Sequence, residues 1–301
     1  MEKIVFNLID DYEGRVVASL FSYKAISEDN MCGSILYIHG YVDYFFQEHI
    51  ADFFNSSGYN FYAIELRKYG SSYLKNQHFN YCRSLSEYFE EIDCAIDYIC
   101  SDNSSKLTLL GHSTGGLIAS LYAAKGKSRD KISKLILNSP FFEFNASWAK
   151  RQLVPLVSPI SKIFPYISKE NEIKVSYFDS IHISEYGEWS FNTDYKPRSG
   201  VPLYFAWLRA VSLGQRELKQ GLNIKIPVLV LCSDKSSNVG KWCSEATVSD
   251  TVLNIKDIVK YSTSLGNNVE VVEVKDALHD VYLSNLESRN FALNISLKFL
   301  Q

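Results

Sequence analysis

The sequence predicts an α/β fold in which helices cover both faces of a mostly parallel central sheet. Short apolar runs alternate with helical stretches over the first 140 residues, and continuous apolar runs are typical of buried parallel strands. The alternation stops between residues 141 and 222 and resumes after Pro227. A chain of 301 residues with 46% hydrophobic residues is long enough for one large domain that carries an insertion, or for two small domains.

The first half of the chain supplies most of the expected sheet. Residues 3–9 and 15–25 are predicted to form two strands joined by a turn at residues 10–14. Ser84 and Glu87 have the spacing of a capping box, so we expect a helix from there to about Cys100. The other expected elements are strands at residues 34–38, 60–66, 106–110 and 134–138 and helices at about 44–57 and 114–125.

The second half contains an insertion rich in aromatic residues. It leaves the predicted sheet directly after a strand, at the edge where open α/β sheets bind ligands. We therefore interpret it as a helical cap, or lid, over an active site; the alternative is a set of packed surface helices. The sequence divides into a core of residues 1–140 and 223–301 and a cap of residues 141–222, with further strands expected at 228–231 and 269–274 and helices at about 251–265 and 286–300.

Composition restricts the classes of partner and cofactor. The formal net charge of −3 and the lack of a long basic run argue against a nucleic-acid partner. The six cysteines form no C-x-x-C pair and match no zinc spacing, so we expect reduced thiols, no metal and no cofactor. The chain has no signal-peptide pattern and no apolar segment of the ~18 residues that a membrane span needs, which favours a cytoplasmic protein. A homodimer is compatible with these features.

One short motif indicates the chemistry. Residues 111–116 read Gly-His-Ser-Thr-Gly-Gly, which fits the pattern G-x-S-x-G, and they follow an apolar strand and precede a helical stretch. Such a turn holds the serine in a strained conformation that only small residues two positions away can tolerate. We therefore predict Ser113 as a nucleophile; the alternative is a glycine-rich turn without chemistry.

The motif also carries a resemblance to a known family. Together with Tyr-Ile-His-Gly at residues 37–40 and Leu-His-Asp at residues 278–280, it resembles the monoglyceride-lipase and lysophospholipase branch of the α/β-hydrolases, a branch also described as serine aminopeptidase-like (S33). The likeness is strong around residues 33–140 and 227–285 and weak through the expected cap. It implies an α/β-hydrolase fold and hydrolysis of carboxylic esters.

A serine nucleophile needs a base and an acid, which follow in the order Ser, Asp or Glu, His in this fold. His279 lies just after the last expected strand, where the resemblance implies the base, and we predict it as the base. His182 is the only other histidine after Ser113 and lies in the expected cap. Asp250 precedes His279 by 279 − 250 = 29 residues and Asp234 by 279 − 234 = 45. A loop, helix and strand take up roughly 25–30 residues, so we favour Asp250 as the acid.

Asp234 stays open as the alternative acid, because it directly follows the strand at residues 228–231. Relatives usually place their acid a few residues beyond this strand, and the equivalent position here is Ser236. If Asp250 is the acid, residues 235–249 are an insertion that carries it back to His279. Asp280 is interpreted as a local turn or cap.

The oxyanion of an acyl-transfer reaction needs two backbone N–H donors. One is expected from Thr114, the residue after the nucleophile, and by resemblance the other comes from Tyr41, the residue after His39-Gly40. Relatives often have small residues here, whereas Tyr41-Val42-Asp43 is bulkier. We interpret His39 as a buried histidine that supports this loop and takes no part in proton transfer.

These residues predict a serine esterase that acts on a small-molecule, lipophilic ester. Monoacylglycerols, lysophospholipids and short acyl esters are the expected substrates, because the insertion is aromatic. One alternative is an amidase or aminopeptidase, which comparison of ester and aminoacyl-amide substrates would separate. The other is a ligand-binding protein without activity, which labelling by a fluorophosphonate would reject.

Overall fold

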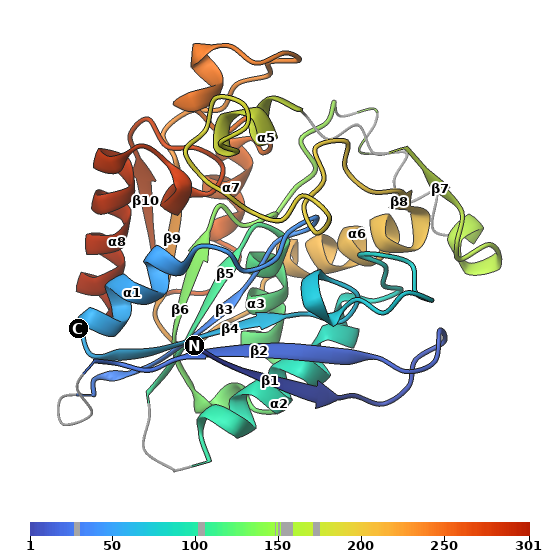
Figure 1. Ribbon diagram of the computed structural model, residues 1–301, viewed down its shortest axis with the longest axis horizontal. Coiled ribbons are helices and arrows are strands. Elements are labelled where there is room, and N and C mark those ends of the chain that lie inside the picture. Colours follow the sequence, from blue (N-terminus) through green and yellow to red (C-terminus); the bar gives the residue numbers. More distant parts are fainter. Residues whose placement is uncertain (27–30, 102–105, 148, 150, 152–158, 171–174) are drawn as a thin grey trace.

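An eight-stranded sheet forms the centre of the molecule (Figure 1). The computed structural model describes residues 1–26, 31–101, 106–147, 149, 151, 159–170 and 175–301. The strand order is β1-β2-β4-β3-β5-β6-β9-β10; β2 is antiparallel to β1 and β4, and every other pair is parallel. The mostly parallel sheet predicted from the sequence is therefore confirmed. The strands are β1 (Glu2–Asn7), β2 (Val17–Tyr23), β3 (Gly33–Ile38), β4 (Tyr59–Glu65), β5 (Leu107–His112), β6 (Ile132–Asn138), β9 (Val228–Ser233) and β10 (Val269–Val274).

Helices cover both faces of this sheet. Alternate residues of one strand serve the two faces: Leu107 and Leu109 pack on one side and Leu110 on the other. The first side is covered by α2, α3, α6 and α7, and the second by α1 and α8. These helices are α1 (Glu48–Ser56), α2 (Phe89–Ile99), α3 (Thr114–Lys125), α6 (Phe205–Lys219), α7 (Ile255–Ser262) and α8 (Leu286–Leu300).

Three helices begin later than the sequence indicates. The helix expected from residue 44 begins at Glu48, because the residues before it form a loop beside the site described below. The predicted capping box of Ser84 and Glu87 is present, but it opens a 3-10 turn, Leu85–Tyr88, that precedes α2. The helix expected from residue 251 begins at Ile255, because the residues before it bind an aspartate side chain.

The inserted segment (residues 141–222) adds no strand to the main sheet in the part that the structure describes. Residues 148, 150, 152–158 and 171–174 of it lie outside the described residues. Its α5 (Val175–Ile181) lies above the carboxyl ends of the strands, whereas α6 packs on the core through Trp207 and Val211 (Figure 1). Two short strands, β7 (Ser168–Lys169) and β8 (Leu203–Tyr204), pair with each other.

The described residues contain no disulfide, no helix suited to crossing a membrane and no cluster suited to a metal ion. No disulfide joins the six cysteines, all of which lie in the described part, and Cys82 and Cys232 are buried. Among the described helices, none is long and apolar enough to cross a membrane. No cluster of three or more His, Cys, Asp and Glu side chains suited to a metal ion occurs within the described ranges.

Candidate active site

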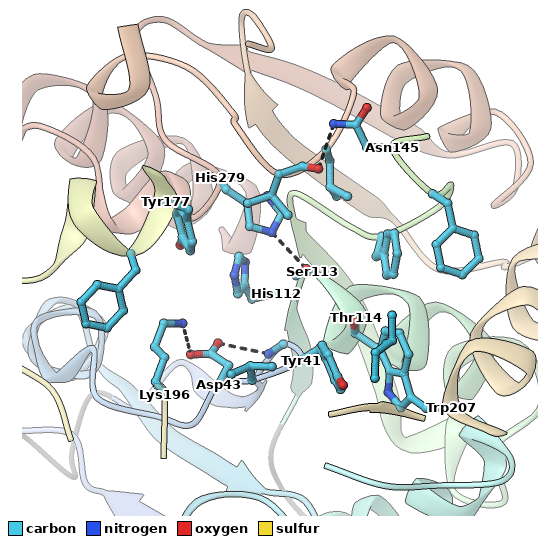
Figure 2. Close-up of a pocket in the computed structure, with 18 of the residues that line it drawn as sticks. Tyr41, Asp43, His112, Ser113, Thr114, Asn145, Tyr177, Lys196, Trp207 and His279 are labelled. Atoms are coloured by element: carbon cyan, nitrogen blue, oxygen red, sulfur yellow. Dashed lines mark hydrogen bonds and ion pairs between the residues drawn. The ribbon is translucent and has the colours of Figure 1, made fainter. Parts of the chain in front are cut away.

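Ser113 lies in a strained turn between β5 and α3 (the Ser113 turn, residues 111–116). Its backbone has φ 54° and ψ −117°, a conformation that non-glycine residues rarely adopt. The glycines around it are required for space: a Cβ on Gly111 would lie 2.5 Å from the Gly115 oxygen, and a Cβ on Gly115 would lie 2.3 Å from the backbone oxygens of Ile38 and His39. The turn thus presents the Ser113 hydroxyl beyond the end of the sheet (Figure 2).

The His279 ring lies between Ser113 and Asp250. Its Nε2 is 3.0 Å from Ser113 Oγ, and its Nδ1 is 2.9 Å from Asp250 Oδ2 (Figure 2 shows the first contact). A carboxylate only accepts hydrogen bonds, so Nδ1 carries the ring proton and Nε2 is free to accept one from the hydroxyl. The second oxygen of the fully buried Asp250 accepts from the amides of Val252 and Leu253 at 2.7 and 2.8 Å, which fixes the carboxylate.

The structure brings Asp250, and not Asp234, to His279. Asp234 Oδ1 instead accepts from the Asp276 amide at 2.9 Å. Residues 236 and 250 pair as a single parallel bridge through two backbone hydrogen bonds. The Ser237 amide donates to the Asp250 carbonyl oxygen, and the Asp250 amide donates to the Lys235 carbonyl oxygen, both at 3.0 Å. The chain therefore leaves the sheet after Ser233, makes an excursion beyond Ser236, and returns Asp250 beside Ser236, the position at which the resemblance implied the acid.

Asp280, the neighbour of His279, holds the loop from the opposite side. It is fully buried, and its Oδ1 accepts from Asn138 Nδ2 at 2.6 Å and from the Tyr282 amide at 3.0 Å. Gln47 Nε2 donates to its Oδ2 at 3.1 Å. Asp280 caps a 3-10 turn (Val281–Leu283), so its interpretation as a local cap is confirmed. Asn138 and Gln47 were not foreseen; the signal for Asn138 was its position at the carboxyl end of a strand.

Residues 39–44, the His39 loop, lie against the Ser113 turn. A Cβ on Gly40 would lie 3.1 Å from Ser113 Cβ, so the backbones of the two segments are in close contact. Tyr41 and Thr114, the residues expected to donate amides to an oxyanion, line the same cavity as Ser113 (Figure 2). Val42 has φ 50°, which is rare for a β-branched residue, and its amide donates to Asn80 Oδ1 at 3.1 Å.

His39 faces away from the hydroxyl and binds backbone. Its Nε2 accepts from the Leu66 amide at 3.1 Å, and its Nδ1 lies 2.8 Å from the Gly40 oxygen. Burial lowers the pKa of His39 to about 4, so the ring is neutral near pH 7. Burial also lowers the pKa of His112, whose Nδ1 lies 3.2 Å from the Asn138 oxygen. Through these backbone contacts, His39 supports the His39 loop and His112 supports the Ser113 turn.

A cavity of about 320 Å³ opens at Ser113, and half of the residues that line it belong to the inserted segment. One side is aromatic and contains Trp207 (Figure 2), and the rings of Phe141 and Phe144, which also line the cavity, pack beside it. The other side contains a buried ion pair that the sequence did not indicate, in which Lys196 Nζ lies 2.7 Å from Asp43 Oδ1. Burial alone would raise the pKa of Asp43, but the Lys196 ammonium and the nearby histidines bring it below its ordinary value.

Known proteins resemble this chain in sequence. It matches the family model described as serine aminopeptidase, S33, over residues 29–256. The monoacylglycerol lipase of Mycolicibacterium smegmatis is 28% identical over 141 residues, which cover 46% of this chain and 48% of that protein. The match therefore spans about half the length of this curated relative.

Solved structures agree over nearly the whole chain. A soluble variant of monoglyceride lipase from Saccharomyces cerevisiae has a TM-score of 0.71 at 16% identity, with 95% of this chain and 92% of that chain covered. The monoacylglycerol lipase of Paleococcus ferrophilus has a TM-score of 0.68 at 20% identity, with 93% and 97% covered. A carboxyl esterase from Bacillus coagulans has a TM-score of 0.67 at 15% identity, with 100% and 98% covered. These likenesses confirm the expected α/β-hydrolase fold. Because the family model matches well over half of its residues, this chain belongs to the serine aminopeptidase S33 family.

Proposed function

We propose that this protein is a serine hydrolase that cleaves carboxylic esters. The observation that carries the proposal is the His279 ring, which has Ser113 Oγ within 3.0 Å on one side and the Asp250 carboxylate within 2.9 Å on the other. This is the arrangement by which a histidine activates a serine hydroxyl for attack on an acyl carbon. Membership of the family and relatives named as lipases and esterases support it.

The proposed reaction has two acyl transfers. His279 removes the Ser113 proton as Oγ attacks the ester carbonyl, and Asp250 stabilises the imidazolium that forms. The amides of Tyr41 and Thr114 bind the tetrahedral oxyanion. His279 then donates its proton to the leaving alcohol, which leaves an acyl-enzyme. A water molecule deprotonated by His279 hydrolyses that intermediate and restores Ser113.

We further propose a lipophilic acyl or aryl group in the substrate, and a role for the inserted segment as a cap. The cavity lies in the range of small-molecule sites, ~300–1,000 Å³, and its wall beside Thr114 is aromatic. Monoacylglycerols, lysophospholipids and short acyl esters share this character. Two structural neighbours are described as monoglyceride or monoacylglycerol lipases, which agrees with this substrate class.

The cavity favours esters over aminoacyl amides. An aminopeptidase needs an acidic group for the substrate ammonium, and Asp43 is the only carboxylate in the cavity lining formed by the described residues. Asp43 is already paired with Lys196. A substrate ammonium would therefore have to displace a buried lysine.

The test is hydrolysis of p-nitrophenyl esters of increasing acyl length, with an aminoacyl p-nitroanilide series beside it. We expect ester hydrolysis that falls by at least about 10⁴-fold in Ser113→Ala while circular dichroism stays unchanged. Turnover that persists in Ser113→Ala would overturn the mechanism. Faster cleavage of the anilides than of the esters would contradict an esterase and identify the protein as an amidase.

A further inference from the structure

The inserted segment binds the His39 loop through a buried ion pair. The Lys196 ammonium, on the inserted segment, lies 2.7 Å from Asp43 Oδ1. The other oxygen of Asp43 accepts from the Gly40 amide at 3.2 Å, next to Tyr41 (Figure 2). Side chains of Lys196 and Asp43 are only 10% and 2% exposed, so solvent screens the pair weakly. A chain of contacts therefore runs from the inserted segment to the backbone beside Ser113.

Two neighbours of Asp43 are also held by the inserted segment. The ring of Tyr41 packs on Trp207 with centroids 3.9 Å apart, and its hydroxyl lies 3.4 Å from the Pro202 oxygen. The amide of Asn192 donates to the Tyr44 hydroxyl at 2.5 Å. The bulky residues of the His39 loop thus serve as attachment points for the inserted segment.

The backbone of the His39 loop needs such support because it is strained. Val42, between Tyr41 and Asp43, has φ 50°, and a β-branched residue keeps this conformation only when its surroundings hold it. On one side its amide is held by Asn80. On the other side the His39 loop is closed by the hydrogen bond that the Gly40 amide donates to the Asp43 side chain. Loss of either restraint allows the chain to relax and to redirect the Tyr41 amide.

We propose that Lys196 is a positioning residue for the oxyanion hole: by holding Asp43 on the Gly40 amide, it fixes the direction of the Tyr41 N–H. The inference rests on the proposed function of Tyr41 as an oxyanion donor. Without the Lys196 ammonium, the Asp43 carboxylate is a buried unpaired charge. It would rotate toward water or become protonated, and its hydrogen bond with the Gly40 amide would be lost or weakened. The ion pair therefore makes the oxyanion hole depend on the position of the inserted segment.

The experiment measures p-nitrophenyl ester kinetics and the affinity of an alkyl trifluoromethyl ketone, which forms a tetrahedral adduct with a serine. We expect Lys196→Met to lower kcat by about 10–100-fold, a loss that is smaller than or similar to that caused by removal of one oxyanion donor. KM should change by less than about threefold. Affinity for the ketone should fall by the same factor as kcat/KM. Lys219→Met is the matched control: it lies in the same segment, is paired with Glu143, and should leave all three values unchanged.

A double-mutant cycle separates positioning from folding. Asp43→Asn keeps an oxygen for the Gly40 amide but leaves the Lys196 ammonium without a partner, so alone it should lower kcat strongly. Combined with Lys196→Met it removes both charges, and we expect the double variant to be at least about fivefold more active than either single variant. If one single variant does not fold, the double variant, which has no unpaired buried charge, is compared with the wild type and with the other single variant.

The outcomes are distinct. Unchanged kcat and ketone affinity in Lys196→Met would overturn the positioning role, as would losses that simply add in the double variant. A change confined to KM would make Lys196 a substrate-binding residue instead and would also overturn it. Failure of the proposed function would be visible separately, as a wild-type protein that neither hydrolyses the esters nor binds the ketone.

Discussion

The Ser113 turn and the His39 loop meet at the same hydroxyl but are held in different ways. The Ser113 turn is fixed by close backbone contacts: a Cβ on Gly111 would meet Gly115, and a Cβ on Gly115 would meet the backbone of residues 38 and 39. The His39 loop is fixed by side chains from distant parts of the chain, including Asn80 and Lys196. A locally determined turn is encoded in a short motif, whereas a loop held from outside can respond to the segment that holds it.

The largest expected effect lies on the side of Ser113. Asp250→Asn should lower kcat by about 10³–10⁴-fold, because an amide no longer orients and stabilises the protonated imidazole. Asp234→Asn is the control, since the Asp234 side chain accepts from the Asp276 backbone amide and not from His279, and it should change kcat by less than about threefold. Steady-state kinetics of the two variants compare the two acids that the sequence offered. Equal losses would contradict the assignment of Asp250.

The next largest effect is expected at Gly115, where a side chain would clash with neighbouring backbone and distort the Ser113 turn. Gly115→Ala should lower kcat by at least about 100-fold and the free energy of unfolding by about 1–3 kcal/mol, because its Cβ would lie 2.3 Å from two backbone oxygens. Gly240→Ala, whose Cβ would meet nothing within 4 Å, should be neutral. Urea unfolding and ester kinetics measure both. A fully active Gly115→Ala enzyme would refute the steric explanation of the turn.

The third prediction concerns acid stability, which should be set in part by the His39 loop. The pKa of His39 is lowered by burial from 6.5 to about 4, so between these values the unfolded chain binds a proton that the folded chain does not. Stability from this residue is present above pH 6.5 and is lost as the pH falls toward 4, by about 3 kcal/mol in total. Urea unfolding should show a shallower dependence on pH in His39→Gln. Parallel curves for the two proteins would contradict the buried neutral ring.

The smallest effect should come from Asn80, the restraint on the far side of Val42. Asn80→Ala leaves the buried Val42 amide without its acceptor, which costs about 1–3 kcal/mol of stability. We expect kcat to fall by about tenfold, less than for outright loss of an oxyanion donor. Asn294→Ala, on the exposed side of α8, is the matched control and should change neither value. A loss in Asn294→Ala as large as in Asn80→Ala would show that the effect is not specific to the His39 loop.

The same contrast explains what the sequence could predict. Strands such as β5 and β9 were found because their apolar runs are bounded by polar residues, and Ser113, His279 and Asp250 followed from a motif and a chain spacing. The helix expected from residue 44 was wrong at its start, because contacts of Asp43 and Tyr44 with the inserted segment hold those residues as a loop. Lys196 lies 153 residues from Asp43, and no local pattern connects them.

The proposed mechanism depends on activation of the Ser113 hydroxyl by His279. The most direct test is to treat the native protein with a fluorophosphonate and to locate the adduct by mass spectrometry of its peptides. We expect one adduct, on the peptide that contains Ser113, which is absent in Ser113→Ala and forms far more slowly in His279→Ala. An adduct on a different serine, or labelling of Ser113→Ala at the wild-type rate, would contradict it.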